Sequence, residues 1–533
     1  MLNINNFFKK DNTFIHIIFI FLVISYVVLG QILIWNIPYS YPFGGPDEPM
    51  HLSMANYIAN YLSWPQWDST EVARNAYGVS YSPGGSIVYW IHGLSYKLFG
   101  YHRLGAYALL LLYLAVTILA YRKNRLAGFF LLAGLLPQTL FTFSYINSDT
   151  GTIIAALLFG MSVGLFITAK EKRKNFFILL FFAGLTITAK LHLWAIAFLT
   201  LVWSIIYKRD TVFSYNKKIW IIAFLIGLLP ASWWFITSYF TNDGDVLGIF
   251  TSAKAIVKFG ASDLPSLARV WSDFSIYDFT YSTLVSLYAN WGWMTLSLDS
   301  YAYILVALIT IFIIIYVYKN IDTKIFIFFT MLLIVNLGFM IVYSTFYDYQ
   351  AQGRYLFPSI YLILGAIASI FITQKIFSKP LLTLLIFISI SNIYFSTKLT
   401  LFNYLDMFQN RPLLQKSIST SYFTHGTYNI DQFQVINGKL IIMGWIFDNQ
   451  KYHTFDTVKL ILRNEEKIYS IQLDTVARPD VARVFKHKSL HSSGFSVKMV
   501  DLTQLPKGTY HLELSIVVEE KVMLINMHKE LNI

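Results

Sequence analysis

Residues 13–36 read TFIHIIFIFLVISYVVLGQILIWN, an apolar run without Asp, Glu, Lys or Arg. About 20 apolar residues in a helix cross the hydrocarbon of a bilayer, so this stretch predicts a membrane-spanning helix. Lys9 and Lys10 precede it, as in a secretory signal peptide. The run is longer than the roughly 7–15 apolar residues of such a signal and lacks a small-residue cleavage site. We therefore expect a retained anchor.

The same pattern recurs along the chain and predicts an all-α polytopic membrane domain of about eleven spanning helices. The expected helices lie at 13–36, 104–121, 126–145, 150–169, 175–189, 191–207, 219–239, 300–318, 325–346, 355–374 and 381–396. Composition agrees, because 56% of the residues are hydrophobic and only 13% are charged, whereas soluble domains carry about 25% charged residues.

The 533-residue chain has a net charge of +12 and no cysteine. Its basic residues stand in short runs between apolar segments rather than on one face, so the charge does not predict a nucleic-acid partner. The missing cysteines exclude disulfides, a thiolate nucleophile and a zinc–thiolate site. A large extracytoplasmic part without disulfides is more typical of bacteria than of the eukaryotic secretory pathway.

Basic residues in short loops predict which helix ends face the cytoplasm. With the N-terminus inside, the inner loops carry seventeen Lys and Arg residues, whereas the outer segments before residue 390 carry eight over much longer stretches. We therefore expect a multi-pass protein of the bacterial cytoplasmic membrane. Its N-terminus is then cytoplasmic and its C-terminal domain extracytoplasmic.

The domain organisation follows from the long segments between and after the apolar runs. Residues 1–400 are expected to form the membrane domain, with large outer loops at 37–103 and 240–299; 401–427 are a linker and 428–533 a β-sandwich. Within the first loop, 49–62 and 84–99 mix apolar, polar and aromatic residues, which is typical of helices lying in the membrane interface.

The C-terminal part alternates between apolar and polar residues. Residues 431–436 and 439–446, joined by Asn437-Gly438, predict a hairpin on a type I′ turn. Further strands are expected near 456–463, 467–473, 494–500, 509–518 and 521–527, with a helical turn near 479–485.

The first outer loop contains Gly44-Gly45-Pro46-Asp47-Glu48-Pro49-Met50-His51. Asp47 fits as the N-cap of a helix starting near Pro49, but this leaves the adjacent carboxylate and His51 unexplained. Ionisable residues at membrane depth are usually functional. A carboxylate here can act as general base on a sugar or lipid hydroxyl, and the pattern does not choose between Asp47 and Glu48. With His51 the pair could instead bind a divalent cation such as Mg²⁺ or Mn²⁺, and the pattern does not settle whether a metal is needed.

Two other predicted helix junctions on the outer side carry polar residues. Asn147 and Asp149 lie in a short turn, where Asp149 fits equally as a helix cap and as a ligand-orienting group. Lys190 and His192 lie at the tip of a hairpin, where the lysine either snorkels or meets an anionic substrate group. These four residues are therefore candidates for substrate binding.

Two aromatic and polar segments complete the candidate site. Gln352, Arg354 and Tyr355 lie at the mouth of a predicted helix, and a guanidinium fork suits a phosphate better than any other side chain. Trp291 and Trp293 in the second large loop could stack on a sugar, although aromatic residues are also common at membrane interfaces.

Together these segments resemble a bacterial domain-of-unknown-function family of predicted multipass membrane proteins. Its marks are a PDEP-x-H segment after the first helix, an S-D turn, a lone Lys in a helical hairpin, a G-W loop and a QGRY-x-x-P stretch. Here they read Pro46-Asp47-Glu48-Pro49-Met50-His51, Ser148-Asp149, Lys190, Gly292-Trp293 and Gln352-Gly353-Arg354-Tyr355 with Pro358. The resemblance covers about residues 13–396. Where that family commonly shows an aromatic residue after the Lys, this chain has Leu191-His192.

The layout also resembles the GT-C superfamily of integral membrane glycosyltransferases. Those enzymes place a catalytic Asp, often followed by Glu, in the first outer loop and use polyprenyl- or dolichyl-phosphate sugars with inversion. Carried over, the resemblance makes Asp47 the base and Arg354 with Lys190 the clamp on the lipid phosphate. It implies transfer of a sugar from a polyprenyl-phosphate donor to a cell-envelope glycan or lipid on the outer face.

Two other functions fit the same composition. A flippase for a lipid-linked glycan is one, although transporters usually bind substrate near the midplane between repeated halves, and this chain shows no repeat. A non-catalytic membrane scaffold whose β-domain binds glycan is the other.

Overall fold

The computed structural model describes most of the chain and divides it into two compact units, Met1–Thr400 and Leu401–Ile533. The described residues are 12–37, 45, 47–74, 78–84, 86–168, 172–259, 275–291, 296–346, 350–404, 414–415, 426–436, 439–448, 454–455, 458–464, 468–476, 478, 481–482, 485, 487–502, 505–518 and 521–533.

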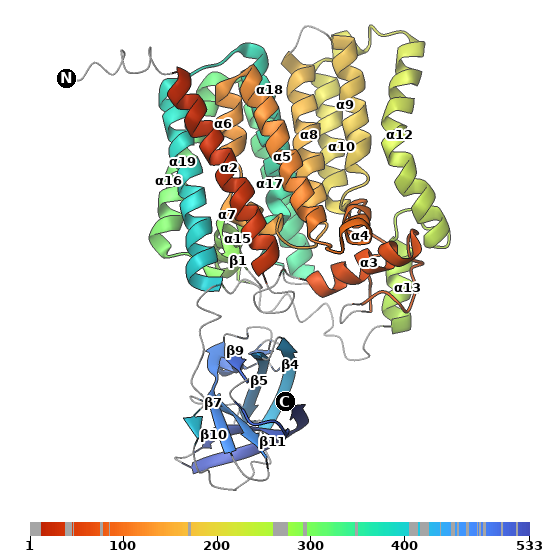
Figure 1. The fold of residues 1–533 in the computed structure, drawn as a ribbon. Coiled ribbons are helices and arrows are strands. Elements are labelled where there is room, and N and C mark those ends of the chain that lie inside the picture. The colour runs from red at the N-terminus through yellow and green to blue at the C-terminus, as the bar shows by residue number, and fades with distance from the viewer. Residues whose placement is uncertain are drawn as a thin grey trace, which may run out of the picture. The chain divides into compact units, whose positions relative to one another are not determined.

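The first unit is helical (Figure 1). Its helices are α2 (Asn12–Asn36), α3 (Glu48–Tyr61), α4 (Val88–Phe99), α5 (Leu104–Lys123), α6 (Arg125–Ala133), α7 (Pro137–Thr142), α8 (Asp149–Thr168), α9 (Lys172–Thr186), α10 (Leu191–Tyr207), α11 (Arg209–Val212), α12 (Lys217–Thr241), α13 (Ile249–Phe259), α15 (Ile276–Tyr288), α16 (Ser300–Asn320), α17 (Thr323–Phe346), the 3₁₀ helix η1 (Gly353–Leu356), α18 (Phe357–Gln374), α19 (Lys379–Lys398) and the π-helix η2 (Leu399–Tyr404). A short ribbon pairs β1 (Asn290–Trp291) with β2 (Leu296–Ser297).

Within the described residues, eight helices are long and apolar enough to cross a membrane. They span Thr13–Asn36, Leu104–Lys123, Asp149–Thr168, Lys217–Thr241, Ser300–Asn320, Thr323–Thr345, Gly353–Gln374 and Lys379–Leu401. Large apolar side chains on the outside of the bundle are exposed, among them Ile17, Phe224 and Phe312. A surface of this kind is stable against lipid rather than water, and the protein is a multi-pass membrane protein.

The prediction of one continuous helix over 126–145 is wrong. The chain forms α6 up to Ala133 and restarts as α7 at Pro137, with Leu136 extended at φ −61° and ψ 156°. A residue before proline is disfavoured in the helical region, because the proline ring clashes with its backbone. The other two predicted spans, 175–189 and 191–207, form α9 and α10, which are shorter than the eight helices above.

Helices α8 and α18 pack side by side and run in the same direction (Figure 1). Gly160 of α8 lies against the carbonyl of Leu362, and Gly365 of α18 lies against the carbonyl of Leu157, so any larger side chain would collide with backbone. Small residues allow membrane helices to approach closely. The contact brings the N-terminal ends of the two helices together.

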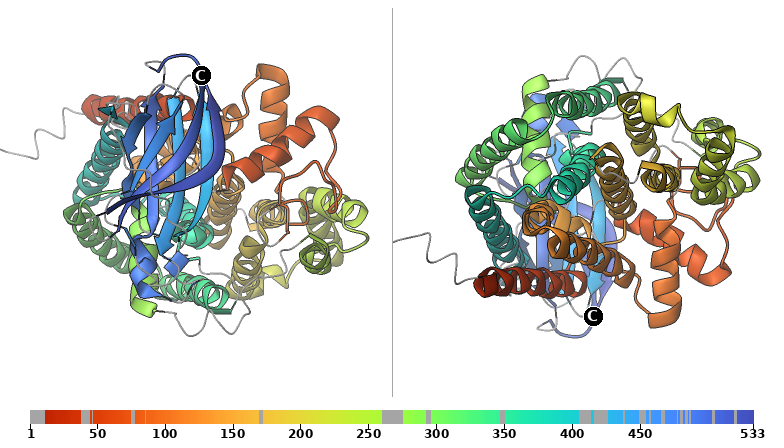
Figure 2. Two further views of the ribbon diagram at one scale, coloured as in Figure 1. Left: turned by 90° about the horizontal axis from the view of Figure 1, so that it is seen from below. Right: turned by 90° about the horizontal axis from the view of Figure 1, so that it is seen from above.

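The expected interfacial helices at 49–62 and 84–99 are α3 and α4. Both are seen lengthwise when the bundle is viewed along its axis, so they lie across the long helices (Figure 2). They pack on each other near the end of α2 that carries Asn36. We call this end of the bundle the Asp47 end. The opposite end, where α5 ends, is called the Arg122 end.

The second unit contains two antiparallel sheets, as the alternation of its sequence predicts. The strands are β3 (Leu414–Gln415), β4 (Gly426–Ile436), β5 (Lys439–Asp448), β6 (Val458–Arg463), β7 (Ile468–Gln472), β8 (Asp474–Val476), β9 (Gly494–Asp501), β10 (Thr509–Val518) and β11 (Lys521–Asn532), with a 3₁₀ helix η3 (Lys488–Ser492). The sheet orders are β11-β10-β6-β7-β3 and β4-β5-β9-β8.

Both sheets contribute to one apolar core, which includes Leu440, Phe495, Leu460 and Leu512. Strands β4 and β5 pair from Ile436 and Lys439 onward, as the hairpin prediction requires. The turn at 437–438 and most of the helical turn at 479–485 lie outside the described residues.

Candidate functional site

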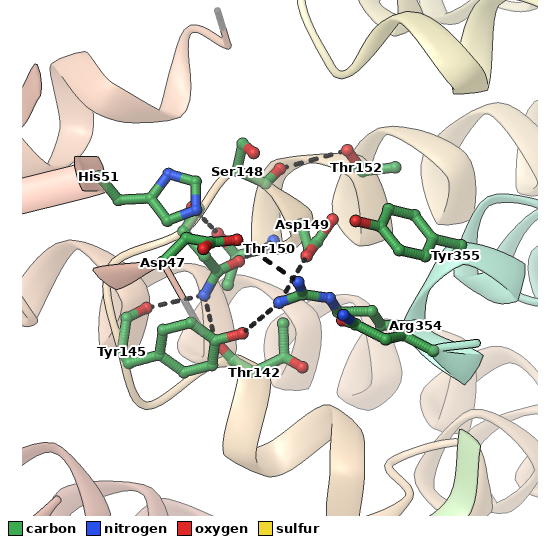
Figure 3. Close-up of polar contacts among 12 residues, drawn as sticks. Asp47, His51, Thr142, Tyr145, Ser148, Asp149, Thr150, Thr152, Arg354 and Tyr355 are labelled. Atoms are coloured by element: carbon green, nitrogen blue, oxygen red, sulfur yellow. Dashed lines mark hydrogen bonds and ion pairs between the residues drawn. The ribbon is translucent and has the colours of Figure 1, made fainter. Parts of the chain in front are cut away.

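Four charged side chains from four separate segments meet at the Asp47 end. Figure 3 shows three of them, Asp47, Asp149 and Arg354. Asp47 precedes α3, Asp149 begins α8, Lys190 precedes α10 and Arg354 lies in η1. Lys190 Nζ lies 2.6 Å from Asp149 Oδ1. Arg354 Nη1 lies 3.8 Å from Asp149 Oδ2, and its Nη2 lies 3.9 Å from Asp47 Oδ2. We call these four residues the charged cluster.

Asp47 is the most accessible member of the charged cluster. Its side chain is 35% exposed, whereas those of Arg354 and Asp149 are 6% and 3% exposed. Asp47 adopts the left-handed backbone conformation at φ 59°, and its side chain makes no capping hydrogen bond to α3. A non-glycine residue in this region costs on the order of 1–3 kcal/mol. The simple N-cap interpretation therefore does not describe this carboxylate.

Arg354 lies at the centre of the charged cluster and is buried. Its Nη1 donates a hydrogen bond to Tyr145 Oη at 3.1 Å. The separations to Asp47 and Asp149 exceed hydrogen-bond length, so those contacts are ion pairs only. Arg354 Nε and Asp149 Oδ2 have no hydrogen-bond partner among the described residues. The cluster thus holds buried polar atoms with unused hydrogen-bonding capacity.

Asn147 explains why the Asp149 carboxylate is available to the cations. The Asn147 Oδ1 accepts a hydrogen bond from Thr150 N at 3.0 Å, which caps the start of α8. Its Nδ2 donates to the carbonyls of Thr142 and Tyr145. Asn147 was predicted to bind substrate, but its amide shapes the turn, and the cap function open for Asp149 is carried by Asn147.

Glu48 is placed differently from Asp47. Arg103 Nε and Nη2 donate to its two carboxylate oxygens at 2.8 and 2.7 Å, and both side chains are 0% exposed. Ile146 N donates to Glu48 Oε1 at 3.0 Å. Arg103 Nη1 also donates to the carbonyls of Ile34 and Ile37 at the end of α2. Glu48 was a candidate base, but its oxygens are committed to this buried pair.

An aromatic layer supports Asp47 from the side of α3 and α4. Tyr81 Oη donates to Asp47 Oδ2 at 3.3 Å, and its ring stacks on His51 at 4.2 Å. The His51 Nδ1 lies 2.6 Å from Tyr89 Oη. Burial lowers the pKa of His51 well below its ordinary value, and the neighbouring Lys190 lowers it further. Burial also raises the pKa values of Tyr81 and Tyr89, so this layer is neutral.

Tyr355 forms the other side of the cluster. Lys190 Nζ lies 5.7 Å from the centre of the Tyr355 ring, within cation–π range. The His192 ring meets Tyr355 edge-on at 6.0 Å. The Gln352 amide donates to Gln350 Oε1 at 2.9 Å. Tyr355 and His192 therefore border the cluster, whereas the amide of Gln352 bonds within its own loop.

Trp291 does not offer its ring to a sugar. It is fully buried, its ring stacks on Phe141 at 5.3 Å, and its Nε1 donates to the Pro137 carbonyl at 3.1 Å. Pro137 begins α7, so this hydrogen bond fixes the indole against the first turn of that helix. Trp293 lies outside the described residues.

Gly353 has a packing function rather than the ligand contact that its place beside Arg354 suggests. A Cβ there would come within 2.2 Å of Leu287 N in α15, and Gly353 N donates to Ser286 Oγ at 2.8 Å. The missing side chain lets η1 lie against α15. That contact fixes the backbone from which Arg354 extends.

The divalent-cation interpretation needs Asp47, Glu48 and His51 to converge. In the structure Glu48 pairs with Arg103, His51 bonds to Tyr89, and Asp47 faces Arg354. No group of three or more His, Asp or Glu side chains suited to a metal ion occurs in the part of the chain that the structure describes. The guanidinium of Arg354 supplies the positive charge next to Asp47.

Sequence reasoning missed Tyr81, Tyr145 and Arg103. Tyr145 stands in the turn that carries Asp149, and Tyr81 lies in the aromatic-rich first loop. The sequence therefore indicated both segments as part of the site but did not identify these two tyrosines. Arg103 was counted only as an outer positive charge. The only sequence signal for its pairing with Glu48 is that the two opposite charges occur in the same predicted loop, 37–103.

Two crystal structures of ArnT from Cupriavidus metallidurans, one bound to undecaprenyl phosphate and one in the apo state, are similar to this chain at 16% and 15% identity, with TM-scores of 0.43 and 0.41. Each match covers 67% of this chain and 60% of ArnT, so this chain spans less than two thirds of that protein. Among curated proteins nothing matches.

The family comparison is more extensive. The model of DUF2142, described as a predicted membrane protein, matches residues 79–363, which is more than half of the chain. This range contains Asp149, Lys190 and Arg354 of the charged cluster. The resemblance expected from the sequence motifs is confirmed, and the chain belongs to the DUF2142 family of predicted membrane proteins.

Proposed function

We propose that the protein is a membrane glycosyltransferase that moves a sugar from a polyprenyl-phosphate donor to a cell-envelope glycan or lipid. The observation that carries the proposal is the charged cluster: an accessible carboxylate, Asp47, beside two cations, Arg354 and Lys190, at one end of a membrane bundle. One ArnT structure holds undecaprenyl phosphate, a lipid phosphate of the proposed class. The proposal rests on the geometry of the charged cluster.

The proposed chemistry needs a base and a phosphate clamp. Asp47 takes the proton from the acceptor hydroxyl while the hydroxyl oxygen attacks the anomeric carbon. The bond between that carbon and the phosphate oxygen breaks, and its electron pair stays on the departing lipid phosphate. Attack opposite the leaving group inverts the anomeric centre. No protein acid is needed, because a phosphate is a good leaving group.

The charges of the cluster match this step. Before reaction the carboxylates of Asp47 and Asp149 balance Lys190 and Arg354. Protonation of Asp47 leaves two cations against the one carboxylate of Asp149. That positive charge arises as the lipid phosphate gains a negative charge, so the cluster stabilises the departing group when its charge develops. Arg354 Nε offers the phosphate a donor without a partner among the described residues.

The neutral aromatic layer has a proposed supporting role. Tyr81 holds one oxygen of Asp47 and leaves the carboxylate oriented toward Arg354. His51 stays uncharged because burial lowers its pKa, so it does not compete for the phosphate. Tyr355 and His192 border the place where the donor would bind.

The test measures sugar transfer by the purified full-length protein. The donor is a polyprenyl phosphate carrying a radiolabelled pentose or hexose, and bacterial envelope membranes supply the acceptor. Asp47→Asn should abolish both the transfer of label and the release of polyprenyl phosphate. Asp68→Asn is the matched control, because Asp68 lies at the same end but pairs with Lys258. Full transfer by a folded Asp47→Asn variant would end the assignment, and movement of the lipid across the bilayer without transfer would favour a flippase.

We also propose that the Asp47 end faces the outside of the cytoplasmic membrane, with the N-terminus inside. The chain has no native cysteine, so a single introduced Cys reports one position. Asp68→Cys, at a half-exposed site, should react with an impermeant thiol reagent in intact cells. Lys218→Cys, at the exposed start of α12, should react only after the membrane is opened. The reverse pattern would refute this orientation.

A further inference from the structure

A cavity lies at the Arg122 end of the bundle. It has a volume of about 650 Å³, within the range of about 300–1,000 Å³ of typical small-molecule sites. Its walls come from the first half of α2, the end of α5 and the residues that begin α6. Its chemistry divides into an apolar groove and a basic mouth.

The groove follows one face of α2. The lining residues His16, Phe19, Ile20, Val23 and Ile24 recur at helical spacing. Eight residues of helix correspond to about 12 Å, so the groove is long enough for the upper part of an acyl chain. The side chains of Ile20 and Ile24 are 56% and 54% exposed, which leaves the groove open to the bilayer.

The mouth is basic. Arg122 and Lys123 end α5, and Arg125 begins α6. The residues lining the cavity, all within the described chain, include these three cations and no carboxylate. Tyr121 stacks on Phe19 at 3.7 Å.

His16 lies between the groove and the mouth and is held from both sides. Its Nδ1 lies 2.8 Å from Tyr121 Oη, and its Nε2 lies 3.4 Å from Arg125 Nη2. The polar end of the groove therefore has a fixed shape where it meets the cations.

We propose that this cavity binds one anionic phospholipid of the adjacent leaflet. The phosphate lies at Arg122 and Lys123, and one acyl chain lies along the α2 groove. Basic residues at a helix end would alone indicate only membrane orientation. The groove that continues from them into the apolar region adds a place for the chain, and the two together select a lipid phosphate over a free anion. This site is separate from the charged cluster, so it does not depend on the proposed function.

The experiment measures retention of phosphatidylglycerol and phosphatidylcholine by the full-length protein, using native mass spectrometry of detergent-solubilised samples. A double variant, Arg122→Gln with Lys123→Gln, removes the mouth charges. Lys217→Gln with Lys218→Gln is its control, because it removes the same charge from the start of α12. Ile20→Trp fills the groove, and Ile17→Trp is its control on α2, since Ile17 is 58% exposed but does not line the cavity.

Each basic residue near a membrane surface contributes about a fivefold change in lipid affinity. We expect wild-type protein to retain phosphatidylglycerol in preference to phosphatidylcholine. The Arg122/Lys123 double variant should retain it at least about tenfold less, and Ile20→Trp should also lower retention, while both controls stay at the wild-type level. An equal loss in the Lys217/Lys218 control would reduce the effect to general surface charge and overturn the proposal. Unchanged retention in Ile20→Trp, or displacement of the lipid by millimolar inorganic phosphate, would also overturn it.

Discussion

Two polar networks built from adjacent residues differ in how completely they are satisfied. Glu48 and Arg103 form a closed network: both are fully buried, and the carboxylate accepts hydrogen bonds at 2.7–3.0 Å from Arg103 and Ile146. Asp47 and Arg354 belong to an open one, in which the ions lie 3.9 Å apart and Arg354 Nε has no partner among the described residues.

The difference separates stability from binding capacity. Removing one partner of a buried ion pair strongly destabilises the folded protein, because the other charge stays buried without compensation. A loose pair gains little from its own contact and can accept a ligand at small cost. Glu48 therefore fixes α3 against the end of α2, and Asp47, one residue earlier, carries the proposed chemistry.

The largest expected effect comes from neutralising each of the two carboxylates in turn. Glu48→Gln should lower the free energy of unfolding by about 3–5 kcal/mol, because Arg103 loses its counter-charge in a buried site. Asp47→Asn should change stability by less than about 1 kcal/mol, since its contact is half-exposed and long. Thermal unfolding in detergent measures both. A Glu48→Gln protein as stable as wild type would remove the distinction between the networks.

The sequence predicted the helices because their signals are local. Long apolar runs and alternating strands were located within a few residues, and Pro137 in the run 126–145 already indicated the break that the prediction passed over. The choice between Asp47 and Glu48 was not local. It depends on Arg103, which lies 55 positions from Glu48, and on a backbone turn that directs the two neighbours to different sides.

Site membership was predictable by segment and not by side-chain direction. Asp149, Lys190 and Arg354 were expected at one membrane face, and the structure brings them together. Asn147 comes from the same turn as Asp149, and Trp291 from the second large loop, but their polar atoms are used by Thr150 N and the Pro137 carbonyl. Pattern alone cannot distinguish these outcomes, because both depend on which neighbour the fold supplies.

The second prediction tests the open network. Arg354→Lys keeps the charge but cannot contact Tyr145, Asp47 and Asp149 at once, because an ammonium lacks the planar fork. We expect the turnover number to fall by about 10²-fold, with little change in thermal stability. Arg74→Lys is the control at the same end, where the guanidinium donates to the Ser69 carbonyl. A normal turnover number for Arg354→Lys would show that the fork is not used.

The third prediction concerns how stability depends on pH through His92, a buried residue of α4. Burial lowers the pKa of His92 to about 4, below the ordinary value of about 6.5. As pH falls, His92 therefore takes up a proton in the unfolded chain before it does so in the folded protein. Its contribution to stability is complete above pH 6.5 and is lost between about 6.5 and 4. The loss from His92 should reach about 2.5 kcal/mol by pH 4.5.

His92→Gln removes this titration and should flatten the acid limb of the unfolding curve by that amount. His511→Gln, at an exposed position of the second unit, should leave the limb unchanged. Equal acid sensitivity in wild type and His92→Gln would assign the loss to other groups.

The smallest expected effect distinguishes packing from substrate contact at Trp291. Trp291→Phe keeps the stacking on Phe141 but removes the hydrogen bond to the Pro137 carbonyl, which should cost about 1 kcal/mol of stability. Because the ring is fully buried, losing this hydrogen bond removes no substrate contact. The KM values for donor and acceptor should therefore stay within about twofold of wild type. A tenfold rise in either KM at unchanged thermal stability would instead place this ring against substrate and extend the open network into the β1 segment.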